Sequence, residues 1–258
     1  NENTAPIYGV LVSQDKMTLT ILRNGGYLEV IPNIREHTKF VRCMSPEEIN
    51  QWIMPKRETT IQTFTGRIVD PLNLAVPSID IIDIAHALSM KCRYSGHSIE
   101  FYSVAEHSIL ISEYFITKAE KSRIDDEKKH YYNLAMYALL HDASEAYLPD
   151  VASPLKPYIV GFKAIENKVS NAIFTRFDMS PVVPPEIKVA DIKILYTEMQ
   201  DNMHSMPDLC LYPDSDITPL DTELKFYGPK EAKEEFLRLF SELEDILKND
   251  VDIGELMV

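Results

Sequence analysis

One stretch constrains the fold of this chain more than any other, because a long apolar run ends in ionisable side chains. Between Leu134 and Glu145 there is neither Gly nor Pro, and Leu134, Ala138 and His141 recur at the spacing of one helix face. The pattern predicts a buried helix that carries His141, Asp142 and Glu145 into the interior. Burying ionisable groups is costly unless they are paired or coordinate a metal, so this stretch indicates a functional site.

Length and composition predict a folded protein with one substantial core. The chain has 258 residues, of which 45% are hydrophobic. No apolar run approaches the roughly 20 residues of a bilayer-spanning helix, and the first residues lack the basic-then-apolar pattern of a signal peptide. Three cysteines are scattered without CxxC spacing, which favours a reducing compartment. We expect a cytoplasmic protein without a membrane partner.

The charge balance disfavours some partners. The chain carries 40 acidic and 26 basic residues, a formal net charge of −14, which opposes binding to a nucleic-acid backbone or an anionic membrane. An anionic small molecule would need local compensation, which a divalent metal ion and a few Lys or Arg side chains can supply. We therefore expect no nucleic-acid partner, whereas phosphate chemistry stays open.

The first part of the chain predicts a small β-containing extension. Residues 8–31 alternate apolar and polar positions around Asn24-Gly25-Gly26, with a second break at Asp15-Lys16, which is typical of a β-meander. A capping-box pattern that begins at Ser45 then predicts a short helix to about Met54.

The remainder predicts a mainly α fold. We divide the chain into the extension, residues 1–60, and a helical core, residues 61–258. The extension carries no catalytic constellation in its sequence. We expect it to serve packing or oligomerisation in a homo-oligomer.

Periodicity and capping signals predict about six helices in the core. Ser78 is the expected N-cap of the first, and Ser103 that of the second, where Glu106 completes a capping-box pattern. The charge-rich run 118–129 is expected to be a solvated connection. Further helices are predicted over residues 133–147, about 158–177, about 186–203 and from Gly228-Pro229 onward, ending in a frayed tail.

The order of ionisable residues favours a divalent metal cofactor. His141 and Asp142 are adjacent, about 100° apart around a helix, and can reach one ion over the helix edge. A histidine and a carboxylate from neighbouring helices would complete the set, and His107 and Asp191 are the candidates. Mixed N and O ligands suit Mn, Fe, Co, Ni, Zn or hydrated Mg. Each residue alone has an ordinary structural explanation; their joint order points to a metal.

Three further residues supply what a hydrolytic reaction needs. Glu145 lies one turn after His141 and can hold or deprotonate an attacking water. A bound transition metal lowers the pKa of water from about 16 to about 7. Lys156 and Arg93, which singly would be solvated charges, can then offset the charge of a phosphate.

The order His…His-Asp…Asp on successive helices resembles that of the HD superfamily of metal-dependent phosphohydrolases. The runs Ser103-Val-Ala-Glu-His107-Ser and His141-Asp-Ala-Ser-Glu145 are similar to those of bacterial 5′-deoxynucleotidases. Arg93-Tyr-Ser-Gly-His97 is similar to a phage-associated branch that includes dATP triphosphohydrolases. The resemblance covers roughly residues 63–203 and implies an HD-domain helical bundle.

The resemblance also implies roles for single residues. Glu145 matches the acidic residue that handles the nucleophilic water. The metal ligands that it implies are His107, His141, Asp142 and Asp191.

On the substrate side, the resemblance implies that Asp150 is a second acidic residue near the scissile phosphate and that Lys156 contacts the phosphate. Arg93 matches an arginine at the phosphate and sugar. Tyr94 stands where relatives often have a Trp or Phe that presses on the deoxyribose and excludes a 2′-hydroxyl. A phenol can instead hydrogen-bond a hydroxyl, so the sugar preference stays open.

The activity implied is hydrolysis of a (deoxy)nucleotide by attack of metal-activated water on phosphorus. The substrate expected is a dNTP such as dATP, cut by a triphosphohydrolase, or a dNMP, cut by a 5′-nucleotidase. The metal, Zn, Mn, Co, Ni, Fe or Mg, stays open. Two alternatives are hydrolysis of a signalling nucleotide, such as a cyclic dinucleotide or guanosine tetraphosphate, and a non-catalytic nucleotide sensor.

Overall fold

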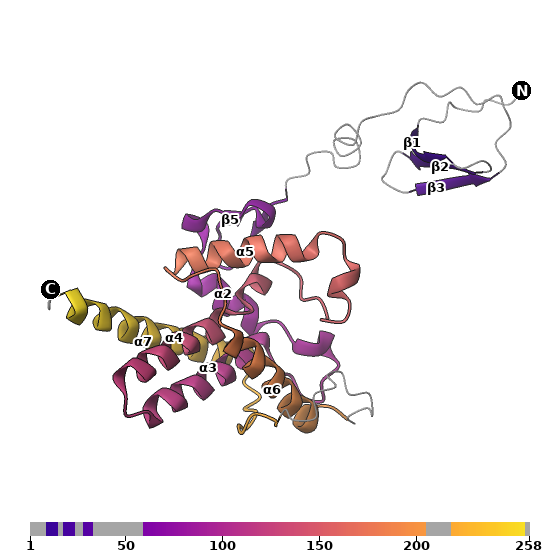
Figure 1. Ribbon diagram of the computed structural model, residues 1–258. Helices are drawn as coiled ribbons and strands as arrows, with labels where there is room; N and C mark the ends of the chain where they lie inside the picture. The colour runs from indigo at the N-terminus through magenta and orange to yellow at the C-terminus, as the bar shows by residue number, and fades with distance from the viewer. Residues whose placement is uncertain (1–8, 15–17, 24–27, 33–58, 205–217, 256–258) are drawn as a thin grey trace, which may run out of the picture. The chain divides into compact units, whose positions relative to one another are not determined.

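The structure is a computed structural model that describes residues 9–14, 18–23, 28–32, 59–204 and 218–255. It divides into two compact units, residues 1–58 and residues 59–258, next to the boundary predicted at residue 60 (Figure 1). The short helix predicted to follow Ser45 lies outside the described residues.

The first unit contains the predicted β-meander. Three antiparallel strands follow one another in the order β1 (Gly9–Gln14), β2 (Thr18–Arg23) and β3 (Leu28–Pro32). The register pairs Gly9 with Arg23 and Leu22 with Leu28. The strands end on either side of the two predicted breaks, which confirms this part of the sequence analysis.

The second unit is mainly helical, which confirms the predicted fold class. It begins with a small hairpin of β4 (Ile61–Gln62) and β5 (Ile68–Val69). No helix in the described ranges is both long enough and apolar enough to cross a membrane. The α-helices described in this unit are α2 (Ile81–Ser89), α3 (Val104–Lys121), α4 (Asp125–Leu140), α5 (Phe162–Arg176), α6 (Pro185–Asn202) and α7 (Pro229–Glu255).

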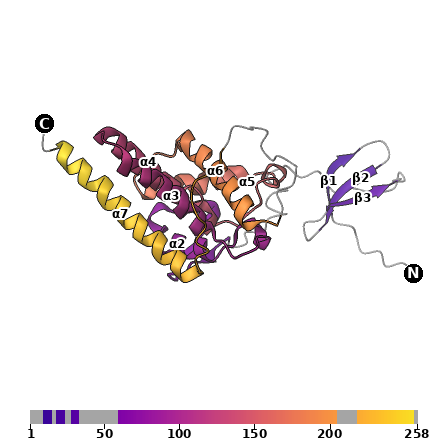
Figure 2. The same ribbon diagram turned by 90° about the horizontal axis from the view of Figure 1, so that it is seen from below.

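The core of this unit lies around the pair α3 and α4, which pack along each other. The buried faces include Ile109 and Ile111 of α3 and Leu134 and Leu139 of α4, all at most 1% exposed. Burial of each such side chain contributes about 1.5–3 kcal/mol to the free energy of unfolding. Helix α7 lies along α2, α3 and α4, and α6 contacts both α3 and α4 (Figure 2). The packing therefore fixes the positions of α3, α4 and α6 relative to one another.

Two predicted boundaries around α3 and α4 are wrong. The run 118–129 is not a connection, because α3 continues to Lys121 and α4 begins at Asp125. Lysines in the last turn of α3 and acidic residues in the first turn of α4 complement the two helix dipoles. The charge-rich run 118–129 therefore forms the end of α3 and the beginning of α4.

The helix predicted to reach residue 147 is also too long. Helix α4 ends at Leu140, and a short 3₁₀ helix, η4 (Ala143–Ala146), follows. The carbonyl of Ala138, which would accept from residue 142 in a continuing helix, accepts from the His141 side chain instead. At α2, the side chain of Asp80, rather than Ser78, caps the helix.

The capping box predicted at the start of α3 is only half correct. The hydroxyl of Ser103 accepts from the backbone N–H of Glu106 at 3.1 Å, as expected. The carboxylate of Glu106, whose residue is fully buried, accepts instead from the backbone N–H groups of Lys225, Phe226 and Tyr227 at 2.7 to 2.8 Å. It thereby ties the segment before α7 to α3.

We predict that Glu106→Ala lowers the free energy of unfolding by about 3 kcal/mol, because it leaves three backbone donors without their charged acceptor. Urea unfolding followed by circular dichroism measures the change. The control is Glu120→Ala, which removes an exposed carboxylate of the same helix and should change stability by less than about 0.5 kcal/mol. Equal midpoints for the two variants would contradict the anchoring role.

Candidate metal centre

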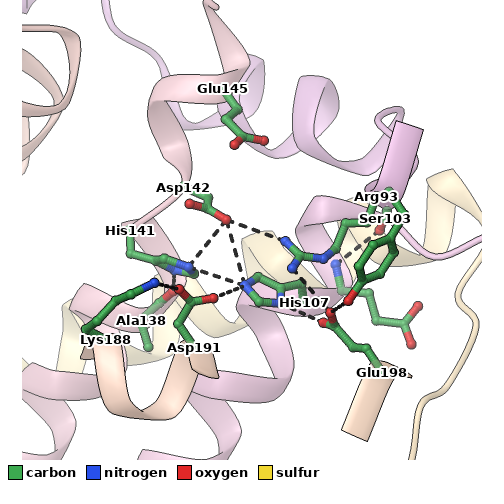
Figure 3. Close-up of polar contacts among 12 residues, drawn as sticks. Arg93, Ser103, His107, Ala138, His141, Asp142, Glu145, Lys188, Asp191 and Glu198 are labelled. Carbon is green, nitrogen blue, oxygen red and sulfur yellow. Dashed lines mark hydrogen bonds and ion pairs between the residues drawn. The ribbon is translucent and has the colours of Figure 1, made fainter. Parts of the chain in front are cut away.

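Two imidazoles and two carboxylates meet where α3, the end of α4 and α6 come together (Figure 3). His107 projects from α3, His141 and Asp142 follow α4 directly, and Asp191 projects from α6. The Nε2 atom of His107 lies 3.3 Å from Nε2 of His141 and 3.4 Å from Oδ1 of Asp191. Oδ2 of Asp142 lies 3.3 Å from Nε2 of His141 and 3.7 Å from Nε2 of His107. The four predicted ligands therefore lie together.

The other ring nitrogen of each histidine is already engaged. Nδ1 of His107 lies 2.7 Å from Oε1 of Glu198, and Nδ1 of His141 lies 2.7 Å from the carbonyl oxygen of Ala138. A carbonyl and a carboxylate can only accept, so each Nδ1 carries the proton and donates it. The two Nε2 atoms then face each other, and in the neutral rings their lone pairs are available to a metal ion. The atoms of His107, His141 and Asp142 lie close enough together to hold one metal ion.

The charges of the cluster reinforce one another. Burial and Arg93 would lower the pKa of His107, but Glu198 and Asp191 outweigh them and raise it to about 9. Burial would raise the pKa of Asp191, yet its hydrogen bond and charge interaction with His107 hold it well below its usual range. The same carboxylates that favour a proton on this imidazole favour a cation beside it.

Glu145 lies in η4, beyond Asp142, and its carboxylate is turned toward the cluster (Figure 3). Burial, followed by the negative charges of Asp142 and Asp150, raises its pKa to about 8. Asp150 itself is half-buried, in the loop after η4. The site therefore holds one carboxyl group that readily binds a proton near neutral pH.

Two lysines surround Glu145. Lys156, at the start of η5 (Lys156–Tyr158), lies 3.8 Å from Oε1 of Glu145 and 2.8 Å from Oε1 of Glu166 on α5. Lys91 donates to the carbonyl oxygens of Glu145 and, at 2.6 Å, Leu148. Sequence reasoning missed Lys91, because its partner Glu145 lies 54 residues further along the chain and no local sequence pattern marks such a contact.

Arg93 and Tyr94 lie in η3 (Arg93–Gly96) beside the cluster. Nη1 of Arg93 lies 3.7 Å from Oδ2 of Asp142, and its Nη2 lies 3.2 Å from Oε2 of Glu198. The phenol of Tyr94 donates to the same Oε2. Its backbone adopts the left-handed region with φ of +55°, which is strained for a residue other than glycine.

Glu198 is the second residue that sequence reasoning missed. It is fully buried, and although burial alone would raise its pKa, Arg93 and His107 hold the pKa at about 2. A signal was present, because Glu198 stands seven residues after Asp191 on α6. Two helical turns separate them, so both side chains project from one face.

Comparisons with known proteins give a family. No protein-family model matches the chain. It is 36% identical over 141 residues to "Uncharacterized protein YfdR" of Escherichia coli (strain K12), covering 55% of this chain and 71% of that protein. It is also 36% identical over 129 residues to "Uncharacterized protein RCAP_rcc00048" of Rhodobacter capsulatus, covering 49% of this chain and 62% of that protein. The two names state no activity. From the extent of the first match, the chain belongs to the same protein family as YfdR.

Proposed function

We propose that this protein is a metal-dependent phosphohydrolase of (deoxy)nucleotides. One observation carries the proposal: Nε2 of His107, Nε2 of His141 and the carboxylate of Asp142 lie close enough to hold one ion, and both Nδ1 atoms are already engaged. Oδ1 of Asp191 lies 3.4 Å from Nε2 of His107. The chain order of these residues matches the His…His-Asp…Asp order on which the resemblance to the HD superfamily rests.

The donor set fits a divalent ion. His107, His141 and Asp142 would hold it, with Asp191 as the fourth ligand through Oδ1. Oδ2 of Asp191 is held at 2.8 Å by Lys188, which leaves Oδ1 on the side of His107. Two imidazoles and two carboxylates suit a transition metal such as Mn, Fe, Co, Ni or Zn better than an all-oxygen Ca²⁺ site.

An ion held there would lower the pKa of a water molecule and polarise a phosphoryl oxygen. Glu145 orients the attacking water and accepts its proton, for which a pKa of about 8 is well matched. The water oxygen forms the new bond to phosphorus, the bond from phosphorus to the leaving oxygen breaks, and the proton passes to that oxygen. Lys156 and Arg93 offset the phosphate charge.

Tyr94 supports a preference for deoxyribose. Its phenol donates to Glu198 and is thereby committed to the protein. The ring is then left as an apolar surface, in the manner of the Trp or Phe of the resembling enzymes. We therefore propose that a 2′-hydroxyl is disfavoured because its own hydrogen bonds would be lost against this ring.

Purified protein is expected to release phosphate, pyrophosphate or triphosphate from at least one member of a dNMP and dNTP panel when Mn²⁺, Co²⁺ or Mg²⁺ is added. EDTA should abolish turnover, and metal should restore it, because the ion supplies the Lewis acid. Product analysis by ion-exchange chromatography identifies the scissile bond. Activity confined to a cyclic dinucleotide or guanosine tetraphosphate would favour the signalling-nucleotide alternative.

Glu145→Gln should reduce kcat by about 100-fold or more, because the water loses its proton acceptor, while the variant still binds metal. Turnover is measured beside metal content determined by mass spectrometry. The matched control Glu120→Gln changes an exposed carboxylate of α3 and should retain wild-type kcat. Metal and nucleotide binding without turnover in the wild type would indicate the sensor instead.

Tyr94→Ala is expected to reduce the ratio of kcat/KM for a deoxynucleotide to that for its ribonucleotide by about tenfold, because the apolar surface is lost. Tyr94→Phe keeps the ring and should keep the ratio. The ratio is measured with paired substrates, such as dAMP and AMP, on the same preparation. An unchanged ratio in the alanine variant would contradict a role of this ring in sugar choice.

A further inference from the structure

Glu198 connects two parts of the proposed site without belonging to either. It lies on the side of the His107 ring opposite Nε2, because it contacts Nδ1. Glu198 therefore contacts His107, a proposed metal ligand, on the side of the ring that faces away from the ion. Its residue is fully buried between α3, α6 and η3, so its carboxylate is reached by protein groups alone.

The two oxygens of Glu198 have different partners. Oε1 accepts from Nδ1 of His107 at 2.7 Å. Oε2 accepts from Nη2 of Arg93 at 3.2 Å and from the phenol of Tyr94. One oxygen thus holds a metal ligand, and the other holds the two residues proposed to meet the substrate.

These contacts determine geometry on both sides. Because Oε1 accepts, Nδ1 of the His107 ring keeps its proton, and Nε2, the atom that would bind the ion, is directed toward His141 and Asp191. Because Oε2 accepts, the side chains of Arg93 and Tyr94 are held in one orientation, although Tyr94 has a strained left-handed backbone. Only an ionised carboxylate can accept from all three donors at once, whereas a glutamine would turn an NH₂ group toward at least one of them.

We propose that Glu198 is a positioning residue that couples metal binding to substrate binding. The inference rests on the proposed function. Glu198 fixes the tautomer and orientation of His107 for the ion and, through its other oxygen, the orientation of Arg93 and Tyr94 for the nucleotide. Loss of its charge therefore weakens both kinds of binding, although the residue contacts neither ligand.

The test titrates the full chain with Co²⁺ by isothermal calorimetry, without substrate, and then measures KM for the preferred nucleotide. In Glu198→Gln, the Kd for Co²⁺ should rise by about 10- to 100-fold, the range found when the partner of a metal-ligating histidine is removed, and KM should rise as well. The matched control is Glu106→Gln, an equally buried carboxylate of α3. It should lower Tm yet leave the Kd for Co²⁺ unchanged.

The outcomes separate this inference from the proposed function. If the wild type fails to bind Co²⁺, or His141→Ala binds it equally well, the metal centre is wrong. If the wild type binds, His141→Ala does not, and folded Glu198→Gln matches the wild type, only the role of Glu198 is overturned. If Gln at this position prevents folding, Tyr94→Phe tests the coupling. Removing the phenol should raise KM while leaving the Kd for Co²⁺ within about twofold, and an unchanged KM would overturn the proposal.

Discussion

The site depends on two imidazole nitrogens that face each other. Nε2 of His107 and Nε2 of His141 lie 3.3 Å apart, and each ring already donates its Nδ1 proton to an acceptor. The nearby carboxylates favour a proton or a cation at these nitrogens and, despite burial, they raise the pKa of His107 to about 9. Asp142 and Asp191 add negative charge at the same point. The packing of α3, α4 and α6 holds these groups together.

The proposed function requires a strongly acidic chain to accommodate an anionic substrate. The net charge of −14 repels phosphate at long range, and salt screens that repulsion beyond about 8–10 Å. At short range, Asp142 and Asp191 would repel it further, while Arg93 and Lys156 are already close to carboxylates. Under the proposed function, a divalent cation at the two imidazoles would offset this negative charge. On this proposal, metal binding and substrate binding are electrostatically linked.

The sequence predicted what depends on local spacing and missed what depends on distant contacts. The β-meander, the mainly α fold and the proximity of the four ionisable residues followed from periodicity, turn residues and motif order. The predicted end of α4 was wrong because the His141 side chain donates to the carbonyl of Ala138, which a continuing helix would use for a backbone hydrogen bond. Lys91 and the carboxylate of Glu106 serve segments far along the chain. Glu198 had a signal, its seven-residue spacing from Asp191, but its partner on α3 is 91 residues away.

The buried carboxylates show why residue type alone could not assign these roles. Glu106 and Glu198 are both fully buried, yet Glu106 accepts backbone N–H groups and holds a segment, whereas Glu198 accepts side-chain donors and orients a site. Backbone donors carry no charge, so burial dominates and raises the pKa of Glu106. Around Glu198, Arg93 and His107 outweigh burial and lower it. The same side chain thus stabilises the fold in one place and prepares the site in another, and the charge of its neighbours decides which.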